Sequence, residues 1–390
     1  MLTIASVLAT APLAIAIYAY LGYPLMLLIV SRLRPRRIDT LEGAPWPAVT
    51  ITVPVYNAAA RIRSTLERLL ELDYPRDRLQ VVVISDASTD GTDDVVSEFA
   101  GRGVELLRLP RRIGKTAAEN AALAVARGEI IVNVDATILV PADSLKPLVR
   151  VFDDPTIGVA SGRDISVGDT GRSGTGAESS YTGYEMWIRD LETQVGSIVG
   201  ASGCFYGIRR SIHARPLPIG LSWDFASPLV AQKQGYRSVS VPAAVCIVAR
   251  TTEIRTEITR KVRTMARGLR TLFYLRALMN PLQYGGFALM LISHKLLRWV
   301  PYLLAPISFA ALCLLALQSV VARTLLGVVL VGVLVGAVAV YRRRSPASAP
   351  VALAGFVVAV LTAGILAWWD ALRQAQMATW EPTPRPEAQT

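Results

Sequence analysis

Long runs without a charged side chain stand near both ends of the chain. A membrane-spanning helix needs about 20 consecutive, mostly apolar residues. Four runs of suitable length occur, at 1–31, 299–322, 324–341 and 345–369. A buried core helix could explain one such run, but four in one chain favour membrane helices. The pattern therefore predicts one N-terminal and three C-terminal membrane helices.

Two further segments precede the C-terminal runs. Residues 254–276 place apolar side chains on one helical face and arginines on the rest, which is typical of a helix lying on a membrane surface. Residues 277–294 have no acidic or strongly basic side chain, but they contain one proline and two glycines. A further crossing there would move the arginines at 342–344 to the outer side. We therefore interpret 277–294 as an interfacial or re-entrant helix.

Between the apolar ends, short β-branched runs alternate with segments of helical spacing. Continuous apolar strands that alternate with helices indicate a mostly parallel sheet covered on both faces. The predicted strands are 49–55, 81–85, 104–109 and 130–134, and the predicted helices are 62–70, 94–100 and 116–127. The middle of the chain is therefore predicted to be an α/β domain.

Composition and charge agree with a membrane protein that carries one soluble domain. The 390 residues are 52% hydrophobic and only 18% charged, against about 25% charged in soluble domains. This excludes a disordered chain. The net charge of +11 comes partly from arginines beside the apolar runs, at 32–37 and 342–344. That placement fits the positive-inside rule with a cytoplasmic middle domain better than it fits nucleic-acid binding.

The chain offers little for several common chemistries. Three cysteines without short spacing and two histidines argue against a disulfide framework and a zinc site. Neither a Gly-x-Gly-x-x-Gly loop nor a P-loop is present, so dinucleotide and P-loop readings have no support.

Two predicted strands end in a carboxylate, Asp86 after 81–85 and Asp135 after 130–134. Ligands bind beyond the carboxyl ends of strands in parallel sheets, so both side chains are expected at one crevice. The alternatives remain open: Asp86 could cap the turn and helix that follow it, and Asp135 could be a turn residue at the start of a loop.

The order and spacing of several segments resemble a known family. The segments Val49–Asn57, Ser85–Thr92, Gly114–Asn120 and Asn133–Thr137 resemble the nucleotide-binding half of inverting family-two glycosyltransferases of GT-A fold. Later segments resemble the acceptor half: Gly200–Gly203, Asp224–Phe225, Gly235–Arg237, Arg260–Arg263 and Ser293–Trp299. The terminal apolar runs fit the membrane-embedded branch, which includes cellulose, hyaluronan and poly-N-acetylglucosamine synthases.

The resemblance implies a role for particular residues. Asp224 would be the catalytic base that takes the proton of the acceptor hydroxyl. Asp135, together with Thr137, would hold a Mg²⁺ or Mn²⁺ ion. The nucleotide would be bound by Pro54, Tyr56, Asp86, Lys115, Asp135 and Arg263. The acceptor would be bound by Gly203, Trp223 and Arg260.

Several of these residues also have an alternative interpretation. Lys115 could be a solvated lysine at a helix start, and Asp224 could cap the helix that follows it. Arg263 could lie on lipid headgroups. The family usually has a second aspartate where this chain has Thr137, and an acidic residue where it has Trp223. Its Gln-x-x-Arg-Trp motif survives only as Arg260 and Arg263 followed by threonine.

The predicted organisation runs from anchor to tail. It comprises an anchor and basic linker (1–44), a cytoplasmic GT-A domain (45–252), basic amphipathic or interfacial helices (253–299), three membrane helices (300–370) and a polar tail (371–390). We interpret 163–183 as a mobile loop and 381–390 as disordered.

These observations predict a multi-pass glycosyltransferase of a bacterial inner membrane. It would move a sugar from a nucleotide-diphosphate sugar, with UDP as the expected nucleotide, to a polysaccharide or lipid-linked acceptor. Limited transfer is favoured over processive synthesis, and further subunits for export or polymerisation could be partners. The alternative is a catalytically silent nucleotide-binding or scaffolding subunit. No nucleic-acid partner is expected.

Overall fold

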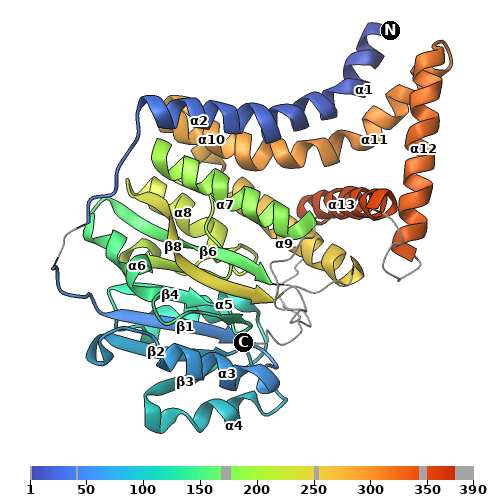
Figure 1. The fold of residues 1–390 in the computed structure, drawn as a ribbon. Helices are drawn as coiled ribbons and strands as arrows, with labels where there is room; N and C mark the ends of the chain where they lie inside the picture. Colours follow the sequence, from blue (N-terminus) through green and yellow to red (C-terminus); the bar gives the residue numbers. More distant parts are fainter. Residues whose placement is uncertain (1, 41–42, 168–176, 250–253, 342–348, 374–390) are drawn as a thin grey trace. The chain divides into compact units, whose positions relative to one another are not determined.

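The computed structural model describes residues 2–40, 43–167, 177–249, 254–341 and 349–373 (Figure 1). These residues form two compact units. The first, called the helical unit here, contains 2–26 and 254–373. The second, called the sheet domain, contains 27–249. Residues 27–40 belong with the sheet domain, where the Arg36 amide donates to the Gln194 carbonyl at 2.7 Å.

The sheet domain is built on eight strands in the order β3-β2-β1-β4-β7-β6-β8-β5. Their bounds are β1 Val49–Val55, β2 Leu79–Ser85, β3 Val104–Arg108, β4 Ile130–Val134, β5 Ile138–Leu139, β6 Ile157–Val167, β7 Phe205–Arg209 and β8 Arg237–Ala249. The first four predicted strands pair in parallel, as expected. The sheet as a whole is mixed, because β7 runs antiparallel to both β4 and β6 and β5 runs antiparallel to β8.

Helices cover both faces of the parallel half, and alternation along each strand explains how (Figure 1). In β2, Val81 and Val83 belong to a core cluster. The same cluster contains residues of the helix that follows β1 and of the helix that follows β2. Val82 and Ile84 join a separate cluster with Ala118 of the helix α5 (Lys115–Val125). Successive side chains of a strand point to opposite faces. A run of consecutive buried valines therefore needs an apolar layer on each side.

The helices of the sheet domain agree with the predicted pattern where one was predicted. Their bounds are α3 Ala59–Leu70, α4 Thr92–Ser97, α5 Lys115–Val125, α6 Leu145–Arg150, α7 Ala177–Val195 and α8 Trp223–Lys233, with α2 Tyr23–Leu33 leading into the domain. Short 3-10 turns join several of them. The prediction of a loop over 163–183 is wrong at both ends, because β6 continues to Val167 and α7 begins at Ala177. Residues 168–176 lie outside the described part of the chain.

The helical unit contains the apolar runs. Its helices are α1 Leu2–Ile17, α9 Ile254–Tyr274, α10 Pro281–Leu291, α11 Leu297–Ala316, α12 Val320–Tyr341 and α13 Ala349–Leu372. Within the described residues, four helical stretches are long and apolar enough to cross a membrane: Leu2–Leu33, Pro281–Ala316, Val320–Tyr341 and Pro350–Leu372. One lies near the N-terminus and three follow the sheet domain, as predicted.

The segment interpreted as interfacial is joined to the span that follows it. Helix α10 continues through the π-helical turn Ile292–Leu296 into α11, so Pro281–Ala316 forms one helical stretch. Gly285 interrupts it with φ of +52°, a conformation that glycine adopts readily. A stretch of 36 residues is longer than one crossing needs. An interfacial position for its first part therefore remains a prediction.

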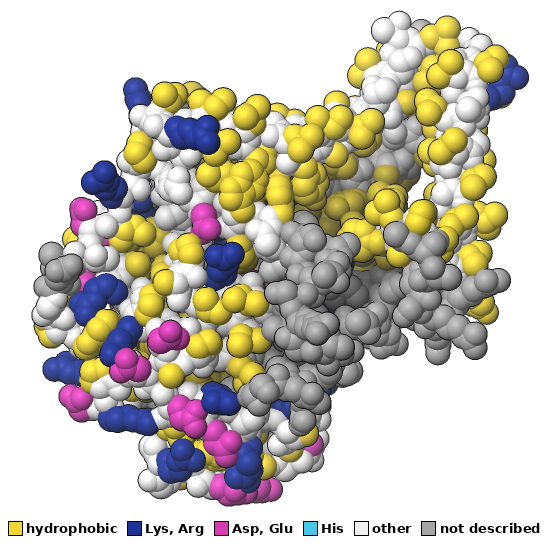
Figure 2. Space-filling model, viewed as in Figure 1, with side chains coloured by type: hydrophobic (Ala, Val, Ile, Leu, Met, Phe, Trp, Pro, Cys, Tyr) yellow, Lys and Arg dark blue, Asp and Glu magenta, His cyan; other side chains and the backbone are white. Residues whose placement is uncertain are grey.

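The two units differ in the side chains that they expose. Figure 2 shows Lys, Arg, Asp and Glu gathered on the visible face of the sheet domain, whereas the long helices present hydrophobic side chains. Large apolar residues of α12 such as Val328, Val331 and Leu334 are 62–65% exposed. Exposed apolar surface of this extent is suited to lipid.

His213 provides a test of the packing of the sheet domain. Its side chain is 3% exposed, its Nε2 lies 2.8 Å from the Ser227 hydroxyl, and its ring stacks near Trp223. Burial lowers the pKa of His213 from 6.5 to about 4. Between these values the unfolded chain binds a proton that the folded domain does not, so stability is lost as the pH falls through this window.

We therefore expect His213→Gln to weaken the acid dependence of stability. The full effect across the window is about 3 kcal/mol. Melting temperatures of the detergent-solubilised parent and variant, measured from pH 7.5 to pH 5, check this. Parallel curves for the two proteins would contradict it.

Candidate functional site

The site lies where the chain changes direction across the sheet. Strands β2 and β3 extend the sheet on one side of β1, and β4 lies on its other side. Such a switch point opens a crevice at the carboxyl ends of the two diverging strands. Pairing between β1 and β4 ends at Thr52, two residues before Pro54. Pro54 has no backbone N–H to pair and is accommodated where the two strands part.

Tyr56 and Asp86 follow β1 and β2 at this edge. The Asp86 amide donates to the Val55 carbonyl at 2.8 Å, which ties the two strand ends together. The Tyr56 side chain is half-buried, and the guanidinium of Arg112 lies over its ring at 3.8 Å from the centroid. The predicted nucleotide-binding pair is therefore brought to one edge, with an arginine beside it.

Asp86 holds the start of α5. Its side chain is 2% exposed, and its two carboxylate oxygens accept from the Ile113 amide at 2.7 Å and the Gly114 amide at 2.8 Å. Gly114 has φ of +109°, which a residue with a side chain rarely adopts. The Asp86 carboxylate at the end of β2 thus binds the backbone that leads into α5.

The capping role considered for Asp86 is carried out by Asp90. Its Oδ1 accepts from the Thr92 amide at 3.1 Å, and its Oδ2 accepts from the Ala59 amide at 3.0 Å. Burial acts to raise the pKa of Asp90, but the hydrogen bonds from Thr92 and Ala59 outweigh it, so this pKa lies below its ordinary value. The turn after β2 is therefore fixed without using Asp86.

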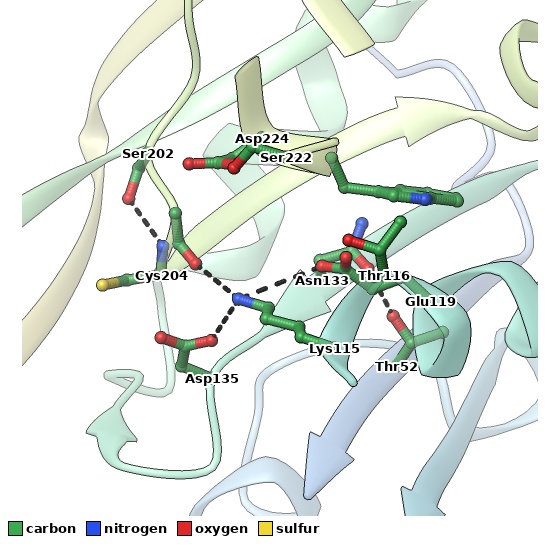
Figure 3. A network of polar contacts seen from close by, with 12 residues as sticks. Thr52, Lys115, Thr116, Glu119, Asn133, Asp135, Ser202, Cys204, Ser222 and Asp224 are labelled. Atoms are coloured by element: carbon green, nitrogen blue, oxygen red, sulfur yellow. Dashed lines mark hydrogen bonds and ion pairs between the residues drawn. The ribbon is translucent and has the colours of Figure 1, made fainter. Parts of the chain in front are cut away.

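Lys115, the first residue of α5, pairs with the second strand-end carboxylate. Its Nζ lies 2.5 Å from Asp135 Oδ1, 3.1 Å from the Gly203 carbonyl and 3.9 Å from Glu119 Oε1. Figure 3 shows the ammonium pointing between Asp135 and Glu119. Because its side chain is only 19% exposed and ion-paired, the alternative of a solvated lysine is not supported by this geometry.

The electrostatics keep Lys115 charged. Burial acts to lower its pKa, but the carboxylates of Asp135, Glu119 and Asp224 outweigh burial and raise the pKa above its ordinary value. One ammonium thus contacts two carboxylates and is influenced by a third, that of Asp224. An arrangement with excess negative charge attracts a further cation.

Asp224 lies across the site from this pair. It occupies the first turn of α8 and is half-buried, and Ser222 donates a hydrogen bond to its Oδ1. A Cβ built on Gly203 would lie 3.0 Å from Asp224 Oδ2. The loop carbonyl that contacts Lys115 and the carboxylate of Asp224 are therefore neighbours, and Gly203 allows their close approach.

The donor set for a metal ion is small. Among the described residues, no group of three or more His, Cys, Asp or Glu side chains is placed to hold a metal. Asp135 supplies one carboxylate, and Thr137 follows it two residues later in a half-buried position. Mg²⁺ is often held by one or two carboxylates together with substrate phosphates. The residues present fit an ion that binds together with the nucleotide.

Three predicted residues are placed differently from the rest. Trp223 is 1% exposed, and its Nε1 donates to Asn120 Oδ1 at 3.0 Å. The indole is thus buried with its polar atom bonded to α5, and its assignment to the acceptor remains a prediction. Arg260 and Arg263 lie on α9 of the helical unit, so their assignment to acceptor and nucleotide remains a prediction.

Several residues of the site were not singled out from sequence. Glu119 is 2% exposed beside Lys115, and Thr116 and Asn120 contact the segment before α8. All three lie within Gly114–Asn120, a segment recognised by its resemblance. Their spacing of three and four residues would have placed them on one helical face. Arg112 carried no such signal.

The arrangement places one ammonium, Lys115, and two carboxylates, Asp135 and Asp224, at one edge of the sheet. Groups of these kinds are chemically able to offset phosphate charge, to ligate a cation and to accept a proton. Charge held in place before reaction stabilises a developing anion most effectively.

Comparison with known proteins relates the chain to glycosyltransferases. The model of the family described as "Glycosyl transferase family 2" matches residues 50–215. An N-acetylglucosaminyltransferase of Mesorhizobium japonicum is 28% identical over 231 residues, 54% of this chain and 53% of that protein. A beta-monoglucosyldiacylglycerol synthase of Synechocystis sp. is 31% identical over 163 residues, 40% of this chain and 34% of the relative. The matches thus span about half or less of these curated relatives.

One solved structure resembles nearly the whole chain. It is the mannosyltransferase PcManGT from Pyrobaculum calidifontis in complex with GDP-Man and Mn²⁺, which is 26% identical with a TM-score of 0.71. The match covers 95% of this chain and all of that chain. The sheet domain is therefore GT-A-like, and the domain at residues 50–215 belongs to glycosyl transferase family 2.

Proposed function

We propose that this glycosyltransferase moves a sugar from a nucleotide-diphosphate sugar to a lipid-linked or polysaccharide acceptor at a membrane surface, with inversion at the anomeric carbon. The observation that carries the proposal is that Lys115 contacts both Asp135 and the carbonyl of Gly203, while Asp224 lies next to the same glycine. The three side chains come from α5, the end of β4 and the start of α8, and they combine cationic and proton-accepting groups in one place.

Each residue has a separate part in the proposed displacement. Asp224 accepts the proton of the acceptor hydroxyl while that oxygen forms a bond to the anomeric carbon. The bond from the anomeric carbon to the diphosphate oxygen breaks, and the nucleoside diphosphate leaves with the electron pair. Lys115 offsets the charge that grows on the diphosphate. A direct attack from the face opposite the leaving group inverts the configuration.

A divalent ion fits the same site. Asp135 and Thr137 would hold Mg²⁺ or Mn²⁺ with the diphosphate oxygens, and the bound ion would supply Lewis-acid stabilisation of the leaving group. This proposal is supported by the excess of carboxylate around Lys115 and by the Mn²⁺ bound in PcManGT. Tyr56 and Asp86 would contact the nucleoside, beside Arg112.

The donor and acceptor are proposed from relatives and from the helical unit. The relatives are named for N-acetylglucosaminyl, glucosyl and mannosyl transfer. We therefore propose UDP-sugars as the first candidate donors and GDP-mannose as the second. The four candidate membrane helices favour an acceptor that is held in or near the bilayer. A position in a bacterial inner membrane, with the sheet domain on the cytoplasmic side, is part of the same proposal.

Asp224→Asn is expected to abolish turnover and to leave nucleotide binding unchanged, because the amide cannot take the proton. Loss of a general base typically costs about 10²- to 10⁴-fold. Nucleotide release from UDP-glucose, UDP-N-acetylglucosamine and GDP-mannose, with lipid extracts as acceptor, measures turnover. Calorimetry with UDP and GDP measures binding.

The matched control is Asp94→Asn, at an acidic residue in α4. Full activity of Asp224→Asn would refute the base assignment. Nucleotide binding by the parent without turnover of any donor would instead favour a catalytically silent subunit.

Turnover is expected to require a divalent ion. Excess chelator should lower the rate at least about tenfold, and Mn²⁺ or Mg²⁺ should restore it. Thr137→Asp adds a second carboxylate and should tighten Mn²⁺ binding in the presence of UDP, measured by electron paramagnetic resonance. An undiminished rate in chelator would contradict the metal site.

A further inference from the structure

The segment before α8 is held by one face of α5. The Asn120 Oδ1 accepts from the Leu217 amide at 3.0 Å and from Trp223 Nε1 at 3.0 Å. The Asn120 Nδ2 donates to the Leu217 carbonyl at 2.7 Å. A single side-chain amide therefore binds both backbone groups of Leu217 and also the first residue of α8.

Thr116 adds a second point of attachment. Its hydroxyl donates to the Leu221 carbonyl at 2.7 Å, and this bond is buried. Thr116 and Asn120 are four residues apart in a helix, so their side chains lie on the same face. Together they engage residues 217, 221 and 223, which lead directly to Asp224.

Two other contacts hold Asp224, and one of them comes from the loop whose Gly203 carbonyl accepts from Lys115. Ser222 donates to its carboxylate, and the Ala201 amide donates to its backbone carbonyl at 3.0 Å. Ser222 lies within the segment that α5 holds. The other contact comes from the loop that precedes Gly203. The attachment to α5 is thus a direct connection from the base to the helix that begins with Lys115.

We infer that Asn120 and Thr116 are positioning residues: they fix Asp224 at a set distance from Lys115 and hence from the leaving group. The helix α5 has 11 residues, or about 16 Å at 1.5 Å per residue. Its first residue, Lys115, carries the ammonium. Thr116 and Asn120 in its first two turns bind the segment that leads to Asp224. A rigid helix between two reacting groups keeps them aligned, and a shift of about 1 Å can cost about 10²-fold in rate.

The buried position of the Thr116 hydroxyl strengthens the attachment. Thr116 is 1% exposed, and leaving a buried carbonyl without a donor carries a desolvation penalty. Replacement of either side chain by an apolar one would let residues 217–223 move to find other partners. The donor contacts of Lys115 and Asp86 would remain in place.

This inference rests on the proposed role of Asp224, and the experiment separates the two. Thr116→Val keeps the shape of the side chain but removes the hydroxyl, and Thr116→Ser keeps the hydroxyl. Asn120→Ala removes all three bonds, and Trp223→Phe removes one. The matched control is Thr50→Val, a buried threonine whose hydroxyl bonds Gln80 at the amino end of β1.

The measurements use the full chain in detergent and the most active donor among UDP-glucose, UDP-N-acetylglucosamine and GDP-mannose. Thr116→Val and Asn120→Ala should lower kcat by about 10- to 100-fold, with donor KM and UDP or GDP affinity changed less than about threefold. Thr116→Ser should retain kcat within about threefold. Thr50→Val should lower the melting temperature without lowering kcat. Trp223→Phe should give a smaller loss than Asn120→Ala and keeps the test available if that variant does not fold.

Equal losses in Thr116→Val and Thr116→Ser, or losses that appear in donor KM instead of kcat, would overturn the inference. So would unchanged kcat in Thr116→Val and Asn120→Ala while Asp224→Asn is inactive. If Asp224→Asn itself is active, the base assignment fails, and with it the positioning role.

Discussion

The start of α5 is bound by two carboxylates, one at the end of β2 and one at the end of β4. The site depends on this arrangement. Asp86 accepts from the Ile113 and Gly114 amides, while Asp135 pairs with Lys115. When one partner of a buried ion pair is removed, the other partner is left as an uncompensated charge with little solvation. The two aspartates therefore place the ammonium and also define the geometry of the sheet edge around it.

The charge at this edge supports the proposed joint binding of a nucleotide and a cation. Asp135 and Glu119 contact a single ammonium, and Asp224 acts on it electrostatically from across the site, so an incoming diphosphate alone would add negative charge to an acidic site. A divalent ion on Asp135 would restore the balance. With Thr137 in place of a second carboxylate, the protein would offer fewer ligands to such an ion, and the proposed site would depend more on the phosphate oxygens of the donor.

The helical unit supplies what a soluble transferase lacks. Its helices expose large apolar side chains, which water would disfavour and lipid accepts. Small residues allow two of these helices to pack closely. A Cβ on Gly336 of α12 would lie 2.5 Å from the Ala354 carbonyl of α13. Close backbone approach through small residues is the usual means of helix association in membranes. Attachment to a bilayer would keep the enzyme near the lipid-linked acceptor that is proposed for it.

The sequence by itself determined the elements whose pattern is local. Alternating β-branched runs located β1, β2, β3 and β4, uncharged runs located four membrane-length helices, and the order of the motifs indicated the family. Asp86 and Asp135 were expected at one edge because parallel strands share their carboxyl ends. These conclusions need only the neighbours along the chain.

Only the tertiary structure decided which groups meet across the chain. The antiparallel β7 and the extent of β6 depend on pairing partners far away in sequence. Trp223 is buried because His213 and Asn120 pack against it, and no local pattern revealed that. Lys115 faces Asp135 and Asp224 because three separate elements converge. Contacts between distant residues depend on how the elements pack. The local spacing of polar and apolar positions does not determine that packing.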